Sequence, residues 1–243
     1  MDTLPDTTAE TVGDSAYRRI RTDLIFGKLT PGQKLKLERM SSAYGTSIST
    51  LRETLNRLCS EGFVVAEGQR GFEVAPISAA EFQEIAELRE LLESHMIEKS
   101  FAAGDLDWEA HIVSAHHKLA AMERLLLSGE RSDAESWKQC DFQFHRALVA
   151  ACGSKVLLDA HAAVYDRYLR YQMIAVVFRG EMAAAEHREL KELALKRDAK
   201  GANEVLHTHI HDCVAHALRN SDWLKPFVVK DTRAEPRKKA RAG

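Results

Sequence analysis

The chain has 243 residues, of which 45% are hydrophobic and 29% are charged, and its formal net charge is −2. This composition is typical of a globular protein with one or two domains, and the absence of any apolar run of about 18 residues excludes a membrane-spanning protein. The acidic start has no signal-peptide core and the four cysteines are widely spaced, so we expect a cytoplasmic protein with reduced thiols.

The N-terminal third contains a helix-turn-helix pattern. Residues 1–14 are polar and are expected to be mobile. Apolar residues then recur at helical spacing and predict helices over 16–27 and 37–44. After a glycine break, Ser47 is a suitable N-cap for an amphipathic helix over 48–61. A short helix, a break and a second helix at this spacing are typical of DNA-binding modules.

The helix over 48–61 has two distinct faces. Its apolar face, which we expect to be buried, carries Ile48, Leu51, Leu55 and Leu58. The opposite face presents hydroxyl, amide and guanidinium groups, which can reach bases and phosphates when a helix enters the major groove. The residues predicted to contact DNA from this segment are Ser47, Ser49, Thr50, Arg52, Asn56 and Arg57.

Two β-like runs, 63–66 and 72–75, follow and are joined by a glycine-rich loop. This hairpin predicts a wing, with Arg70 and Gly71 at its tip close to the phosphate backbone. Between residues 15 and 78 there are ten Lys and Arg against six Asp and Glu. This local basic excess favours DNA over the alternative, a protein-binding helix-turn-helix. We place the winged helix-turn-helix domain at 15–77.

The rest of the chain has no strand pattern. Residues 78–81 form a capping box, and apolar residues then recur at helical spacing in blocks separated by glycines. The blocks are 79–103, 107–128, 132–152, 155–179, 181–199 and 202–220. They predict an antiparallel all-α bundle over 78–222, so the fold class is mainly α. The basic stretch 223–243 is expected to be a disordered tail, with a supporting nucleic-acid contact as the alternative.

Polar residues fall on the apolar stripes of three bundle helices. The inward set is Asp141, His145, His187 and His209. A buried aspartate is costly unless it is paired or binds a metal. His207 and His211, in contrast, point toward the polar side of the last helix. One aspartate and three histidines suit Zn²⁺, Ni²⁺ or a similar divalent ion, whereas the alternative for each histidine is a hydrogen-bonded core residue.

Arg89 also lies on an apolar stripe, and a buried guanidinium needs an anion. That anion is either an effector carboxylate or Glu93, one turn later, in a structural ion pair. Arg167 and Arg170 are further candidates of the same kind. Their alternative role is to form an aromatic and basic helix face.

Several motifs resemble those of a known family. Segments 27–35, 51–58 and 61–64 resemble the winged-helix domain of the GntR family of transcriptional regulators. Segments 87–93, 141–145, 186–188 and 197–199 resemble the FCD effector domain of its FadR subfamily. Around 107–110 and 170–171 the chain is similar to carbon-starvation regulators that respond to glutarate-type acids.

The resemblance implies a dimeric bacterial regulator, usually a repressor, that binds a palindromic operator. It also implies an FCD bundle that binds a divalent metal and a small mono- or dicarboxylate, for which Arg89 and Arg170 are the candidate partners. The expected metal is Zn²⁺, with Ni²⁺ or Mn²⁺ as alternatives. The family's ligands correspond to Asp141, His145, His187 and His209, which helical periodicity also selects.

The chain departs from the family pattern at the recognition helix. Ile48 stands where the family has an arginine that contacts DNA, so Arg52 and Arg57 would carry more of the readout. Two other functions are weighed: a metal sensor without an organic effector, and a metal-dependent hydrolase. The hydrolase needs a general acid or base beside the metal, and the inward residues supply none, so we expect no enzymatic activity.

Overall fold

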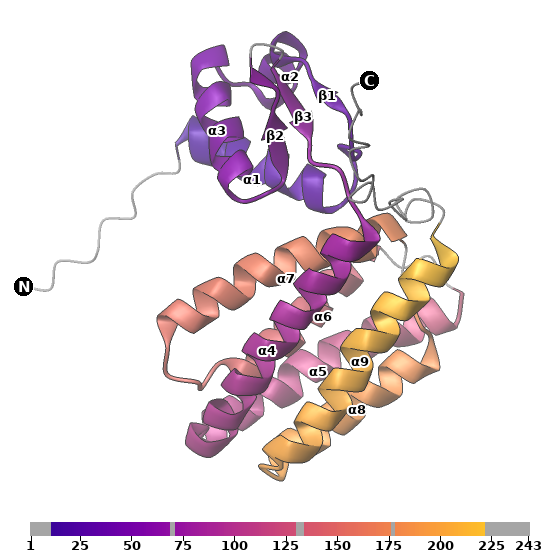
Figure 1. Ribbon diagram of the computed structural model, residues 1–243. Coiled ribbons are helices and arrows are strands. Elements are labelled where there is room, and N and C mark those ends of the chain that lie inside the picture. The colour runs from indigo at the N-terminus through magenta and orange to yellow at the C-terminus, as the bar shows by residue number, and fades with distance from the viewer. Residues whose placement is uncertain (1–10, 69–70, 130–133, 176–177, 222–243) are drawn as a thin grey trace, which may run out of the picture.

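The computed structural model describes residues 11–68, 71–129, 134–175 and 178–221, and it has a small N-terminal unit above an elongated helical bundle (Figure 1). The N-terminal unit contains α1 (Val12–Ile25), β1 (Lys34–Leu35), α2 (Leu37–Tyr44), α3 (Ile48–Ser60), β2 (Val64–Ala66) and β3 (Phe72–Val74). The bundle contains α4 (Ala79–Ala103), α5 (Leu106–Leu127), α6 (Ala134–Val149), α7 (Lys155–Ala175), α8 (Glu181–Leu195) and α9 (Ala199–Asn220). The prediction of a mainly α fold is confirmed.

The sheet of the N-terminal unit is antiparallel, in the order β1-β3-β2, and β2 and β3 form the hairpin of the wing. The strand β1 was not predicted, because two residues are too short to show an alternating pattern. The helix α1 begins four residues before the predicted start. Its cap explains the difference, since the Thr11 side chain accepts a hydrogen bond from the backbone N–H of Asp14 at 3.1 Å.

The turn between α2 and α3 follows the sequence pattern. Gly45 ends α2 in the left-handed conformation with φ of 65°, which glycine adopts without strain. Ser47 caps α3 by accepting from the backbone N–H of Thr50 at 3.1 Å. The expectation that Ile48 is buried was wrong, because it is 41% exposed. As the first residue of α3, its side chain is directed toward the N-terminal end of the helix and extends beyond the packed face.

The bundle helices lie close to the predicted blocks, with one difference at the start of α9. Gly201 was expected to break the chain, but it lies within the first turn of α9. The Asp198 side chain accepts from the backbone N–H of Gly201 at 2.9 Å, and this cap begins the helix three residues earlier than predicted. No helix among the described residues is both long and apolar enough to span a bilayer.

Two hydrophobic cores stabilise the molecule, and α7 contributes to both. The larger core lies among the bundle helices. The smaller lies among α1, α2, α3 and the sheet, and it also includes Tyr165 and Leu169 of α7. Figure 1 shows α7 along the side of the bundle that faces the N-terminal unit. The helix α7 is therefore the packing surface on which the N-terminal unit rests.

Candidate metal and effector site

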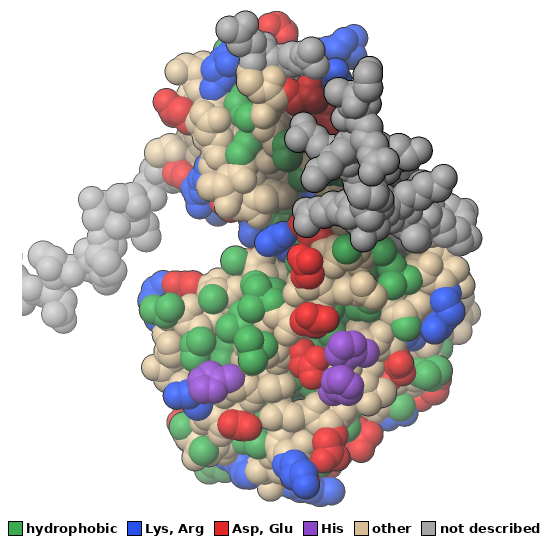
Figure 2. Space-filling view, viewed as in Figure 1, with side chains coloured by type: hydrophobic (Ala, Val, Ile, Leu, Met, Phe, Trp, Pro, Cys, Tyr) green, Lys and Arg blue, Asp and Glu red, His purple; other side chains and the backbone are tan. Residues whose placement is uncertain are grey.

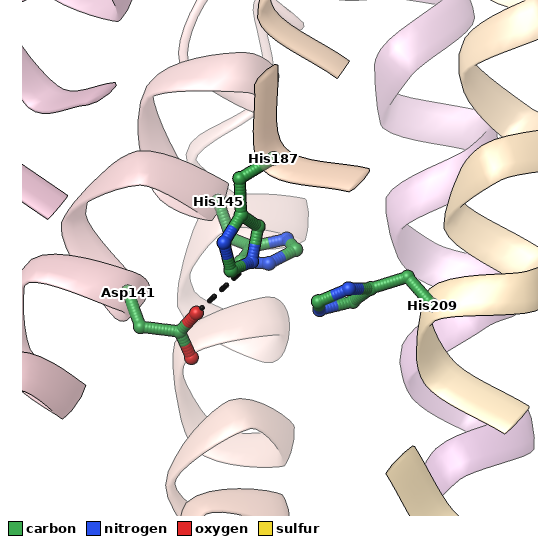
Figure 3. Close-up of side chains that lie close together, drawn as sticks. All are labelled: Asp141, His145, His187 and His209. Atoms are coloured by element: carbon green, nitrogen blue, oxygen red, sulfur yellow. Dashed lines mark ion pairs between the residues drawn. The ribbon is translucent and has the colours of Figure 1, made fainter. Parts of the chain in front are cut away.

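Four side chains from α6, α8 and α9 converge inside the bundle (Figure 3). They are Asp141, His145, His187 and His209, and a ligand atom from each lies within 4.8 Å of the others. Nε2 of His187 is 3.3 Å from Oδ1 of Asp141. All four side chains are buried. The structure thus brings together the whole ligand set that the sequence predicts, from helices whose mutual orientation periodicity does not specify.

Each histidine of the set is held by a glutamate from another part of the bundle. The pairs, measured from Nδ1 to the nearest carboxylate oxygen, are His145–Glu93 at 3.1 Å, His187–Glu123 at 2.6 Å and His209–Glu186 at 2.7 Å. A carboxylate on Nδ1 keeps the proton there and leaves the Nε2 lone pair for a cation. Nε2 of His145 is buried without a hydrogen-bond partner, and Nε2 of His187 faces only Oδ1 of Asp141, 3.3 Å away within the ligand set. This donor set fits a divalent transition metal.

Asp141 is ionised and uses its two oxygens differently. Oδ2 accepts from the Tyr165 hydroxyl at 2.8 Å and lies 3.2 Å from the Lys138 ammonium. Oδ1 faces His187. Burial alone would raise the pKa of Asp141, but Lys138 and His187 outweigh it and hold this pKa well below its usual value. One oxygen is therefore fixed by the protein, and the other is directed toward the histidines.

The histidines differ in their affinity for a proton. Burial lowers the pKa of His187, but its hydrogen bonds to Asp141 and Glu123 outweigh burial and raise that pKa to about 8. Burial dominates at His209 and, with the neighbouring His187, holds the pKa of His209 well below its usual value. Without a metal ion, His187 is the histidine of the cluster that carries a second ring proton. A metal ion that binds His187 must displace that proton.

A small cavity beside the cluster is lined by cationic side chains. Its volume is about 10 Å³, close to the space of one water molecule. Lys138 and Arg179 line it together with three of the ligands. Arg179 bonds to Glu186 and lies 3.2 Å from Nδ1 of His209. The cavity therefore offers two cationic side chains, each already paired with a carboxylate, and it has no room for an organic anion until a side chain moves.

Arg89 is fully buried and forms the structural ion pair. Its Nε lies 2.7 Å from Glu93, and its guanidinium lies over the rings of Tyr165 and Tyr168, 4.5 Å from each centroid. Glu93 also bonds to His161 at 2.9 Å. Within the guanidinium of Arg89, only Nη1 lacks a hydrogen-bond partner among the described residues. Arg89 thus positions Glu93 beside His145, and its own Nη2 lies 3.0 Å from Nδ1 of His145.

The other two candidate arginines lie at the junction between the units. Arg170 is buried and donates from Nη2 to the carbonyl of Ala75, just after the wing. Arg167 lies 2.6 Å from Glu81 at the start of α4. Neither lines the cavity beside the ligand cluster. The structure therefore places Arg170 between the two units rather than in the candidate effector pocket.

The predicted DNA-contacting residues differ in how far their side chains are free to reach DNA. Ser49, Arg52 and Asn56 are exposed on α3. Ser47 and Thr50 bond to each other at the helix cap. Gly71 lies on the wing in the left-handed region with φ of 102°, and Arg70 lies outside the described residues.

Arg57 is held back against α1. Its guanidinium lies over the Tyr17 ring, 3.7 Å from the centroid, and its Nε is 3.4 Å from Glu61. It remains partly exposed, with 57% of its side chain accessible. Arg52 is therefore the α3 arginine better placed to reach a phosphate or base without first losing an internal contact.

Sequence reasoning missed four residues around the cluster: Lys138, Glu123, Arg179 and Glu186. A signal existed for Glu123, since it continues the buried stripe of Ile112 and Leu119 on α5 and is itself buried. A buried acidic side chain on such a stripe needs a hydrogen-bonding or cationic partner, as Asp141 does. No comparable pattern marks Arg179, which precedes α8 in a connecting segment.

Comparison with known proteins gives the same picture for both units. Residues 13–74 match the family described as bacterial regulatory proteins, gntR family, and residues 84–212 match the FCD domain. The chain is 31% identical over 200 residues to the HTH-type transcriptional repressor GlaR of Escherichia coli K12, covering 80% of this chain and 90% of that protein. It is 30% identical over 204 residues to the uncharacterized HTH-type transcriptional regulator BphR of Paraburkholderia xenovorans LB400, covering 83% of each.

The fold agrees with these relationships. The solved structure of E. coli McbR/YncC has a TM-score of 0.73 to this chain at 18% identity, and the match covers 86% of this chain and 98% of that one. The family and these relatives are transcriptional regulators, so the expectation of no enzymatic activity is confirmed. The chain belongs to the gntR family of bacterial regulatory proteins, with an FCD domain behind its DNA-binding helix-turn-helix.

Proposed function

We propose that this regulator is a homodimeric repressor that binds a palindromic operator and senses a small mono- or dicarboxylate through a metal in its FCD domain. The observation that carries the proposal is the buried cluster of Asp141 and three histidines, in which each Nδ1 contacts a glutamate and the Nε2 atoms of His145 and His187 have no partner outside the ligand set. In a transcriptional regulator, a buried metal site of this kind either detects a ligand or stabilises the fold.

The proposed ligands are Asp141, His145, His187 and His209. When bound, a divalent ion such as Zn²⁺, Ni²⁺ or Mn²⁺ supplies open positions at which carboxylate oxygens bind. The chain contributes the cationic side chains of Lys138 and Arg179, which line the same cavity and attract an anion. Arg89 does not line the pocket, and it acts on the site through Glu93 and through the contact of its Nη2 with Nδ1 of His145.

The helix α7 is the proposed route from this site to the DNA-binding unit. Tyr165 contacts Asp141, Asp166 lies 2.5 Å from Arg21 of α1, and Arg170 donates to Ala75. Effector binding would change the operator affinity only if it favours one arrangement of α7 over another. We assign 15–77 to DNA binding and 78–222 to effector sensing and dimerisation.

Two surface features support the DNA and dimer parts of the proposal. Ser49, Arg52 and Asn56 are exposed on one helix, as a major-groove reader requires. On α4, Leu88 is 42% and Leu91 is 68% exposed, and Figure 2 shows hydrophobic side chains gathered over α4 and α7. We propose that a second copy of the chain covers this face, which would bring two recognition helices to the two halves of a palindrome.

The decisive experiment combines metal analysis with ligand binding. Untagged wild type, His187→Ala and the control His116→Ala, another buried histidine, are loaded with Zn²⁺ and dialysed. We expect His187→Ala to retain one zinc equivalent fewer than the other two proteins. Each is then heated with glutarate, 2-hydroxyglutarate and other small carboxylates. A carboxylate that binds the folded state raises the melting temperature of wild type and His116→Ala only. Equal zinc content in all three proteins would overturn the proposal.

A metal sensor without an organic effector is the second candidate. The observation that favours it is the volume of about 10 Å³ beside the ligands, which holds no carboxylate in the present arrangement. The two functions are separated by measuring operator binding by fluorescence anisotropy. A metal sensor responds to Zn²⁺ alone and is unaffected by every carboxylate in the panel.

A further inference from the structure

A second group of metal-ligating side chains lies on the outside of the bundle. His207 and His211 are four residues apart on α9, and their ring centroids are 4.3 Å apart. Glu90 of α4 bonds to both, through one carboxylate oxygen at 2.8 Å from His207 Nδ1 and the other at 2.8 Å from His211 Nε2. Figure 2 shows a histidine pair beside acidic side chains over α4 and α9. These three residues are called the outer cluster.

We propose that the outer cluster is a solvent-facing binding site for a divalent transition-metal ion of the Zn²⁺ or Ni²⁺ class. One ligand atom from each residue lies within 4.8 Å of the other two. If each imidazole carries its proton on the other ring nitrogen, the two inner nitrogens and the carboxylate direct lone pairs to a common region. Two imidazoles and one carboxylate form a three-ligand set that leaves further positions for water.

The chemistry of the cluster selects the kind of ion. Imidazole nitrogen suits Zn²⁺, Ni²⁺ and Cu²⁺, whereas Mg²⁺ and Ca²⁺ prefer sites made of oxygen. The surroundings favour a cation, because the carboxylates of Glu87 and Asp212 line a hollow of about 350 Å³ together with His211. Arg179 neutralises Asp212 only weakly, since its Nη1 is 3.9 Å from Oδ2 of Asp212.

Exposure distinguishes this site from the buried one. The side chains of His207 and His211 are 60% and 43% exposed, so an ion reaches them without opening the bundle. His209 lies between them in sequence but is buried in the inner set. An ion in the outer cluster would join α9 to α4 without using any inner ligand. The two sites can therefore be removed separately by mutation.

The test counts the metal ions bound by the full-length chain after its affinity tag is removed. Metal-free protein is titrated with Zn²⁺ against a chromophoric chelator, and the titration is repeated with Ni²⁺. Wild type should bind one equivalent more than the double variant His207→Gln/His211→Gln. Glu90→Gln should weaken that equivalent at least about tenfold, because it removes the anionic ligand. The difference should disappear when Mg²⁺ or Ca²⁺ is used.

Two further proteins make the count specific. The control His111→Gln/His117→Gln changes two exposed histidines of α5 and should bind as wild type does. His187→Ala should retain the outer equivalent, which separates this proposal from the buried site. Melting temperatures of the metal-free double variant and of the α5 control are compared first, and both should lie close to wild type because the substituted histidines are largely exposed. The proposal is overturned if the double variant binds as many equivalents as wild type while remaining folded.

Discussion

The hydroxyl of Tyr165 donates a 2.8 Å hydrogen bond to Oδ2 of Asp141, although the ring of Tyr165 is buried in the hydrophobic core of the N-terminal unit. A candidate metal ligand and the DNA-binding unit thus share one side chain. The same ring lies 5.8 Å from the ring of His145, measured between centroids. Any change in the charge or position of Asp141 acts directly on a residue that supports the winged helix.

Tyr165→Phe should weaken the communication between the two units while preserving their packing. The variant keeps the ring and removes the hydrogen bond to a buried carboxylate, which we expect to lower the free energy of unfolding by about 1.5–3 kcal/mol. Operator affinity should remain, but its change on addition of Zn²⁺ and carboxylate should be smaller than in wild type. Urea unfolding and fluorescence anisotropy measure the two effects.

The control for that experiment is Tyr168→Phe. Tyr168 is equally buried and lies at the same 4.5 Å from the Arg89 guanidinium, but its hydroxyl contacts the carbonyl of Ile210 at 3.5 Å instead of Asp141. Its response to ligand should match wild type. If both variants respond equally, the Tyr165 hydroxyl has no special part in the communication.

Glu123→Gln should lower the metal affinity of the inner site about 10- to 100-fold, because second-layer carboxylates orient a ligating histidine and increase its basicity. Glu123 lies 2.6 Å from Nδ1 of His187. Competition with a chromophoric chelator measures the affinity. Glu109→Gln, on the same helix but paired with Arg197 at 2.5 Å, is the control and should bind metal normally. An unchanged affinity in Glu123→Gln would mean that His187 does not depend on this carboxylate.

Arg52→Ala should weaken operator binding about tenfold and reduce the slope of log affinity against log salt by about 1 if the guanidinium contacts a phosphate. Arg52 is exposed on α3, and the helix should remain intact because its buried face is unchanged. Arg124→Ala removes an exposed arginine from α5 and is the control. Anisotropy titrations at several salt concentrations test the prediction, which fails if the two variants behave alike.

His116 should make the protein less stable in mild acid. Burial, followed by the charge of Lys191 and the nearby His187 and Arg188, lowers the pKa of His116 to about 4, and Glu192 offsets this only in part. The unfolded chain takes up this proton near pH 6.5, whereas the folded chain does so only near pH 4. Stability is therefore lost as pH falls through this window, from about pH 6.5 down to about pH 4.

The corresponding measurement compares urea unfolding of wild type and His116→Phe at pH 7 and pH 5 in chelator. His116 packs edge-on against Phe144 at 5.5 Å between centroids, so phenylalanine keeps a ring in that place. The variant should lose less stability than wild type on acidification. His117→Gln, an exposed neighbour, should retain the full loss. A variant that loses as much as wild type would show that His116 does not cause the acid sensitivity.

The sequence predicts the inner ligand set because helical periodicity decides which side chains point inward. Asp141 and His145 share one face, and His187 and His209 lie on the apolar stripes of their own helices. Periodicity does not specify which helices face one another, so the pairing of His209 with Glu186 required the structure. The pairing of Arg89 with Glu93 was available from the sequence, since both lie on one helix four residues apart.

Two residues, Ile48 and Arg170, lie in surroundings that differ from those predicted by the sequence pattern of their helices. Ile48 is apolar but lies at the end of its helix, where its side chain is only partly covered. Arg170 belongs to an inward-facing stretch of α7, but it is directed to the carbonyl of Ala75 because α7 has the N-terminal unit along one side. A helix that serves two cores has two buried faces, and its sequence alone does not show which core each residue joins.

The position of Tyr165 and Leu169 in the smaller core also limits how this regulator can be recombined. A chimera cut after the wing, which joins residues up to 77 to an unrelated sensor, would expose the apolar surface that α7 now covers. Such a hybrid would need an equivalent aromatic and aliphatic pair on its new sensor. Exchange of sensor domains within the family is therefore constrained by the surface of α7. A functional exchange would have to transfer that surface together with the DNA-binding domain.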